Sequence, residues 1–247
     1  MQNQFDPRTR TTGVNPAVSV GVPRAARDAG LRSYMLSVYN YMASGVLLTG
    51  IVAMLFASSG MAAQVFQGGG VLPWLIILSP LAIVIAMSFG QNRMSTATLQ
   101  MLFWSFATLM GLSMSTIFLV YTGVSIAQTF FAVSAGFLGL SLWGYTTKKD
   151  LSGWGTFLIM GVVGLIVAMA INFFFLKSAG MQMAISAIGV LIFAGLTAYD
   201  TQKIKSMYAY VAGTDMMGKV VIMGALNLYL DFINMFMFLL NFMGSRE

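Results

Sequence analysis

The segment VVIMGALNLYLDFINMFMFLLNFMGS (220–245) decides the fold of this chain. It exceeds the ~20 apolar residues that cross a bilayer, yet it contains one charged residue, Asp231. A carboxylate at the centre of a membrane helix costs roughly 2.5–3.5 kcal/mol on insertion scales, so such a group usually faces a partner or a water-filled path. Asp231 is therefore the first candidate functional residue.

The composition of the whole chain is that of a membrane protein. Of its 247 residues, 58% are hydrophobic and 8% are charged, whereas a soluble domain carries about 25% charged residues. The chain has no cysteine and no histidine, which excludes disulfides, His-ligated zinc and Ser–His catalysis. We therefore predict an all-α polytopic membrane protein that is not an enzyme and has no cofactor. The net charge of +6 marks topology rather than a nucleic-acid partner.

Apolar segments of spanning length follow one another along the chain. We predict seven transmembrane helices, at about residues 34–57, 71–90, 96–121, 126–145, 154–176, 182–202 and 220–243. Residues 203–219 are expected to form the only longer loop. Residues 1–32 are rich in arginine and proline and are expected to be a disordered basic tail, so the seven-helix domain covers residues 33–247. A six-span arrangement with one re-entrant segment is the alternative.

Basic residues are distributed unevenly over the connecting segments. With the tail in the cytoplasm, eleven of the 13 Lys and Arg residues lie on the cytoplasmic side, and only Lys177 and Arg246 lie outside. The positive-inside rule therefore predicts a cytoplasmic N-terminus, and seven spans then place the C-terminus outside. The short loops and the basic tail suit a bacterial inner membrane.

A second acid, Asp200, ends the preceding span within TAYDTQ (197–202). Spacing alone does not show whether Asp200 and Asp231 touch. If they do, the two carboxylates share one proton and titrate in two steps, or they hold a cation that prefers oxygen ligands, such as Ca²⁺. The alternatives are an interfacial Asp200 that pairs with Lys203, and an Asp231 that is a satisfied interhelical contact.

Three asparagines accompany Asp231 on the last helix, namely Asn227, Asn234 and Asn241. At 100° per residue the four side chains fall within about 80° of arc, so this polar stripe is expected to face the bundle interior. Its amides either belong to the functional site or hold neighbouring helices together. Arg93 is the only charge between Arg32 and Lys148. It is either a topology determinant or a cation that pairs with one of the acids.

The strings AYDTQKI (198–204), ALNLYLDFIN (225–234) and LLNFMG (239–244) closely resemble the transmembrane Bax inhibitor motif family, the Bax inhibitor-1-like proteins. The resemblance covers roughly residues 30–244. It implies a seven-helix bundle with the last helix at the centre, wrapped by the other six. It also implies a pH-sensitive Ca²⁺ leak gated by Asp200 and Asp231, which would contact the ion transiently, with Arg93 as the gating partner.

This chain departs from some of those relatives at an outer ion pair. The corresponding positions here hold Ala82 and Asn241, so that contact cannot form. The alternative function is a non-transporting regulator that binds membrane proteins such as quality-control proteases. An intramembrane aspartyl protease is disfavoured, because Leu-Tyr-Leu precedes Asp231 where such enzymes need Gly-x-Gly. The expected partners are therefore the lipid bilayer, Ca²⁺, protons and membrane proteins.

Overall fold

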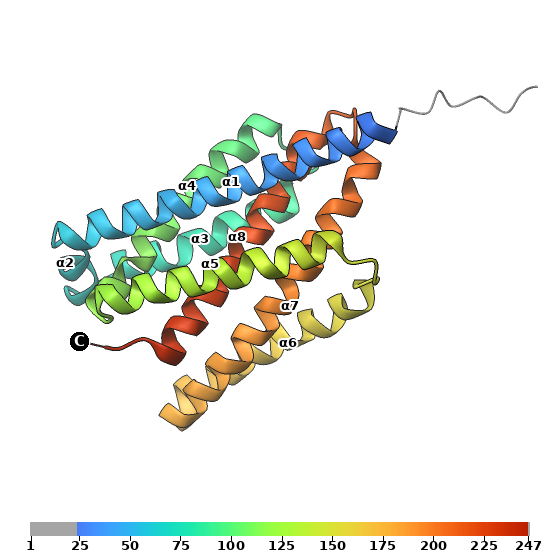
Figure 1. Cartoon of the computed structure of the whole chain (residues 1–247). Helices are drawn as coiled ribbons and strands as arrows, with labels where there is room; N and C mark the ends of the chain where they lie inside the picture. The colour runs from blue at the N-terminus through green and yellow to red at the C-terminus, as the bar shows by residue number, and fades with distance from the viewer. Residues whose placement is uncertain (1–23, 247) are drawn as a thin grey trace, which may run out of the picture.

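The structure, a computed structural model, describes residues 24–246 and contains seven long apolar helices (Figure 1). They are α1 (Arg24–Ser58), α3 (Leu72–Gly90), α4 (Thr96–Met114), α5 (Gly123–Thr146), α6 (Ser152–Ile171), α7 (Ala179–Val211) and α8 (Met216–Met243). A short helix, α2 (Met61–Gln67), joins α1 to α3. Single turns of 3₁₀-helix (Ser115–Leu119) and π-helix (Asn172–Leu176) extend α4 and α6. The predicted all-α fold with seven spans is confirmed, which favours it over the six-span alternative.

Helix α8 lies at the centre of the bundle. In its most apolar stretch 72% of the residues are buried, against at most 39% in the other six spanning helices. The helices α1, α4, α5 and α7 pack directly on α8, and α7 does so most extensively. The central position is the one that the resemblance implies. However, α3 packs mainly on α4 and α6 mainly on α7, so four helices rather than six enclose α8.

Two predicted boundaries differ from the structure. Residues 24–32, which we expect in the disordered tail, form the first turns of α1, and residues 203–211, which we expect in a loop, continue α7. Only residues 212–215 separate α7 from α8. The rest of the expected tail, residues 1–23, lies outside the described residues, as does residue 247.

The first turns of α1 pack against the end of α7, where Gly30 lies directly against the hydroxyl of Tyr208. The hydroxyl of Tyr34 donates a hydrogen bond of 3.2 Å to the carbonyl of Ile204. The rings of Tyr34 and Tyr208 lie 5.4 Å apart between centroids. Because these contacts join residues far apart in the sequence, the hydropathy of either segment alone does not reveal them.

The end of the chain is attached to the start of α5. The amide of Thr122 donates to the carbonyl of Ser245 (3.2 Å), and the amide of Ser245 donates to Oγ of Ser125 (3.0 Å). Figure 1 shows the start of α1 and the C-terminal end at opposite ends of the bundle. An odd number of spans requires this separation.

Candidate functional site

The face of α8 that packs on α7 contains Asp231. Gly224, Asp231 and Phe238 are seven residues apart and therefore share one face of α8. Gly224 packs against Ile204 of α7, and the ring of Phe238 stacks on Phe193 at 5.8 Å between centroids. Asp231 is midway between these two contacts on α8. Because α7 and α8 are antiparallel neighbours joined by a short connection, Asp231 lies level with the turn 197–200 of α7.

The carboxyl group of Asp231 is enclosed by the bundle. The residue is 4% exposed, and its Oδ2 atom has no hydrogen-bond partner. An ionised carboxylate buried without a partner is costly, and unpaired buried polar atoms are uncommon in folded proteins. A proton, a cation or a water molecule would satisfy Asp231 Oδ2.

The second predicted acid, Asp200, is brought to the same level of the bundle. It is half-buried on α7, within the turn 197–200 that lies level with Asp231. Lys203, about one turn further along α7, is exposed. The helices α4 and α5 contain no charged residue, and α1 has none after Arg32. The charges that surround Asp231 therefore come mainly from α7.

A chain of hydroxyl groups runs beside the two acids and was not foreseen from the sequence. Thr201 donates to the carbonyl of Thr197 at 2.7 Å, and its Oγ1 lies 3.0 Å from Oγ of Ser141 on α5. Ser141 Oγ lies in turn 2.5 Å from the hydroxyl of Tyr39 on α1. The chain thus connects α7, next to Asp200, to α5 and α1. Single polar residues on three different helices carry no spacing signal, so sequence analysis could not find them.

Gln202 ties α7 to the connection between α5 and α6. Its Oε1 atom accepts a hydrogen bond from the amide of Leu151 (2.8 Å), and its Nε2 atom donates to the carbonyl of Lys149 (2.8 Å). In the same connection, hydrogen bonds from the side chain and backbone of Ser152 hold the pKa of Asp150 below its usual value. Thr201 and Gln202, which directly follow Asp200, therefore hold α7 to α5 and to the connection after α5.

The three asparagines lie on a stripe of α8 next to the one that contains Asp231. Asn227, Asn234 and Asn241 are seven residues apart, and each is half-buried. The side chain of Asn234 donates to the carbonyl of Leu230 in its own helix (2.8 Å). Asn241 accepts a hydrogen bond of 2.9 Å from the hydroxyl of Tyr121. The amide of Asn241 thus joins two segments, whereas that of Asn234 satisfies itself locally.

Arg93 is not brought to the acids. It is exposed in the turn that connects α3 to α4. Thr96, three residues after Arg93, packs against Gly218 near the start of α8. Asp231 is 13 residues further along, about 20 Å at 1.5 Å per residue. An Arg93–aspartate contact would require a different arrangement of α3 and α4.

The two acids do not line the main cavities of the described structure. Neither the groove of about 600 Å³ between α1 and α5 nor the smaller cavity of about 290 Å³ against α8 includes Asp200 or Asp231 in its wall. Within residues 24–246, no three acidic side chains gather as a metal-binding group. Two carboxylates supply few of the 6–8 oxygen ligands that Ca²⁺ takes. The arrangement is thus suited to a proton or to a transient cation contact.

Comparison with known proteins identifies a family and several relatives that this chain resembles in sequence. The family model described as "Inhibitor of apoptosis-promoting Bax1" matches residues 31–247. An uncharacterized protein of Rickettsia prowazekii (strain Madrid E) is 49% identical over 222 residues, which cover 89% of this chain and 92% of the relative. Inner membrane protein YbhL of Escherichia coli (strain K12) is 44% identical over 221 residues, which cover 89% of this chain and 94% of the relative.

Proposed function

Because this chain belongs to the Bax inhibitor-1 family of multi-pass membrane proteins, we propose that it is a pH-sensitive cation leak channel. Ca²⁺ is the permeating ion, and Asp200 and Asp231 form the gate. The observation that supports this proposal most directly is the unpaired Oδ2 atom of the buried Asp231, with a second acid, Asp200, at the same level on the neighbouring α7. The inner membrane named for the Escherichia coli relative is the proposed location, with the N-terminus in the cytoplasm.

The gate works through the charge of the carboxyl pair. While one proton is shared, the pair carries a single negative charge and α7 stays packed on α8. Loss of that proton leaves two like charges in a region of low dielectric constant, where their repulsion is strong. A cation with oxygen ligands, or separation of α7 from α8, relieves this repulsion. Either response couples pH to the passage of a cation.

The small number of carboxyl groups at the described pair favours the passage of Ca²⁺ over its tight binding. A site that holds Ca²⁺ tightly gathers several carboxylates and carbonyls in one loop. In residues 24–246 the acids do not gather in threes, so Ca²⁺ would keep part of its water shell at the gate. Weak contact of this kind lets an ion leave as readily as it enters.

The test is Ca²⁺ flux into proteoliposomes that contain a Ca²⁺-sensitive dye, measured from pH 5.5 to 8. The wild type is compared with Asp231→Asn and Asp200→Asn, which keep the side-chain shape and remove the titrating group. Asp215→Asn is the matched control, because Asp215 is exposed in the connection before α8. We expect pH-dependent flux in the wild type and in the control, and flux without this pH dependence in both site variants.

Other outcomes have equally definite meanings. If Asp200→Asn and Asp231→Asn keep the wild-type pH profile, the pair is not the gate. If the wild type gives no more flux than empty liposomes at any pH, the protein is not a leak channel. The alternative, a regulator that binds other membrane proteins, then becomes the leading function.

A further inference from the structure

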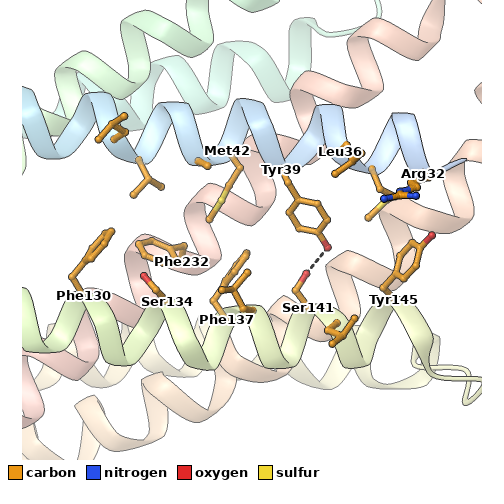
Figure 2. Close-up of a pocket in the computed structure, with 16 residues that line it drawn as sticks. Arg32, Leu36, Tyr39, Met42, Phe130, Ser134, Phe137, Ser141, Tyr145 and Phe232 are labelled. Atoms are coloured by element: carbon orange, nitrogen blue, oxygen red, sulfur yellow. Dashed lines mark hydrogen bonds between the residues drawn. The ribbon is translucent and has the colours of Figure 1, made fainter. Parts of the chain in front are cut away.

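A long groove lies between α1 and α5, which each pack more extensively on α8 than on each other (Figure 2). Both helices pack on α8, and Phe232 of α8 forms part of the groove wall. The volume of about 600 Å³ is within the range of about 300–1,000 Å³ that is typical of small-molecule sites. The groove is therefore large enough to hold an elongated ligand.

The rim of the groove faces the hydrocarbon of the bilayer. Leu47 on α1 and Leu138 on α5 both line the groove, and they are 65% and 67% exposed. Both belong to membrane-spanning helices, so their exposed atoms contact lipid rather than water. A ligand can enter the groove sideways from the membrane.

The hydroxyls of Tyr39 and Ser141, which line the groove, are already paired. The hydroxyl of Tyr39 lies 2.5 Å from Oγ of Ser141, as Figure 2 shows, and Ser141 Oγ lies 3.0 Å from Oγ1 of Thr201. The remaining wall is largely Leu, Met, Phe and Val. An apolar chain in the groove would leave none of these three hydroxyls unsatisfied, so covering them does not carry the usual cost of burying an unpaired polar group.

Positive charge is concentrated at one end of the groove. Figure 2 shows Arg32 and the hydroxyl of Tyr145 at this end, and Arg32 is the only charged residue in the wall among residues 24–246. Lys205 is a second cation nearby, because its Nζ atom lies 4.8 Å from the centre of the Tyr145 ring and donates to the Tyr145 carbonyl at 2.6 Å. Basic pockets between spanning helices are suited to anionic lipid headgroups.

We propose that this groove binds an anionic glycerophospholipid. One acyl chain lies between α1 and α5, against Phe232, and the phosphate lies at the end of the groove against the guanidinium of Arg32 and the hydroxyl of Tyr145. The apolar groove matches the chain, and the Arg32 end matches the negative headgroup. The bound lipid fills the space between two helices that enclose α8, so it stabilises the closed bundle from outside the acid pair.

The test is native mass spectrometry of the full chain from micelles that contain equal amounts of dioleoyl phosphatidylglycerol and dioleoyl phosphatidylcholine. We expect the wild type to retain the anionic lipid in preference. Arg32→Gln should lower its retention about fivefold, the effect typical of one cation near an anionic lipid. Lys148→Gln is the matched control, because Lys148 is an exposed cation in the connection after α5 and does not line the groove. It should change retention less than twofold.

A second variant tests the position of the acyl chain. Ser134 lines the groove, and the chain has no cysteine, so Ser134→Cys provides a single thiol. Benzyl methanethiosulfonate on this thiol should displace the lipid, whereas unlabelled Ser134→Cys, its own folding control, should retain it. Equal losses in Arg32→Gln and Lys148→Gln, retention of lipid after benzylation, or occupation by a second copy of the chain would overturn the proposal.

Discussion

Tyr229 and Thr49 form a hydrogen-bonded contact at the centre of the bundle. Both residues are buried, and the hydroxyl groups lie 2.7 Å apart. Thr49 donates its only hydroxyl proton to the carbonyl of Ala107 on α4 (2.8 Å), so Tyr229 donates to Thr49. These two bonds connect α8, α1 and α4, two residues before Asp231 on the central helix.

Replacement of Thr49 should lower the free energy of unfolding more than removal of the Tyr229 hydroxyl. Tyr229→Phe deletes one donor and should lower the free energy of unfolding by about 0.5–1.5 kcal/mol, the net value of one hydrogen bond. Thr49→Val leaves the Tyr229 hydroxyl unpaired and removes the bond to Ala107, whose carbonyl keeps its helical partner in α4, so it should cost about 1–3 kcal/mol. Denaturant unfolding in detergent, followed by circular dichroism, measures both.

Thr108→Val is the control for this pair of variants. Thr108 bonds only to the carbonyl of Trp104 in its own helix, so its replacement should change stability by less than about 0.5 kcal/mol. A Thr49→Val protein as stable as the wild type would show that the contact does not hold the three helices together.

At the scale of the element, small residues set how closely α5 and α7 approach. Gly144 of α5 lies directly against the backbone of Ala198 of α7, and a Cβ atom there would overlap the Ala198 carbonyl. Backbone atoms cannot turn aside as a side chain can. Close contact of this kind is the common role of glycine in membrane helices. Asp200 follows Ala198 by two residues, so this contact also positions the candidate gate.

Gly144→Ala and Gly139→Ala should therefore have opposite effects on stability. Gly144→Ala forces α5 away from α7 and should destabilise the protein by about 1–3 kcal/mol, the usual cost of overpacking. Gly139 is in the same helix with open space around its Cα atom. Its replacement should be neutral or stabilising by up to about 1 kcal/mol, because alanine is the better helix former. Thermal unfolding of the two variants side by side distinguishes them, and equal effects would contradict the proposed close contact.

At the scale of the whole molecule, each spanning helix reverses the direction of the chain. The connection before α6 contains Lys148 and the start of α7 contains Ala179, so one span separates these two exposed positions. The positive-inside rule predicts that Lys148 faces the cytoplasm. Ala179 and Ser245 then face the outside, because two further spans separate Ala179 from Ser245.

Single cysteines test this orientation without background, because the chain has none of its own. In intact bacterial cells a membrane-impermeant maleimide should label Ala179→Cys and Ser245→Cys. It should label Lys148→Cys only after the cells are permeabilised. Labelling of Lys148→Cys and Ala179→Cys from the same side would mean that α6 does not cross the membrane. A complete reversal of the pattern would mean that the predicted orientation is wrong.

Much of the fold could be predicted because its signals are local. Spanning helices are recognised by continuous runs of apolar residues, and Asp231 stands out because a charge in such a run is costly. The central place of α8 follows from the resemblance and agrees with its polar positions, since a helix with polar groups on one side and large apolar groups elsewhere is best buried. That Asp200 lies at the same level of the bundle as Asp231 depends on the register of α7 against α8, which the sequence does not show.

The sequence by itself thus determined the membrane class, the seven spans and the two acids. The tertiary structure alone decided the helical segments at 24–32 and 203–211, the hydroxyl chain from Thr201 to Tyr39, and the groove between α1 and α5. Each of these depends on side chains that are distant in sequence; Tyr34 and Ile204, for example, are separated by 170 positions. Hydropathy and helical periodicity are properties of one segment, whereas contacts of this kind exist only once several helices have packed around α8.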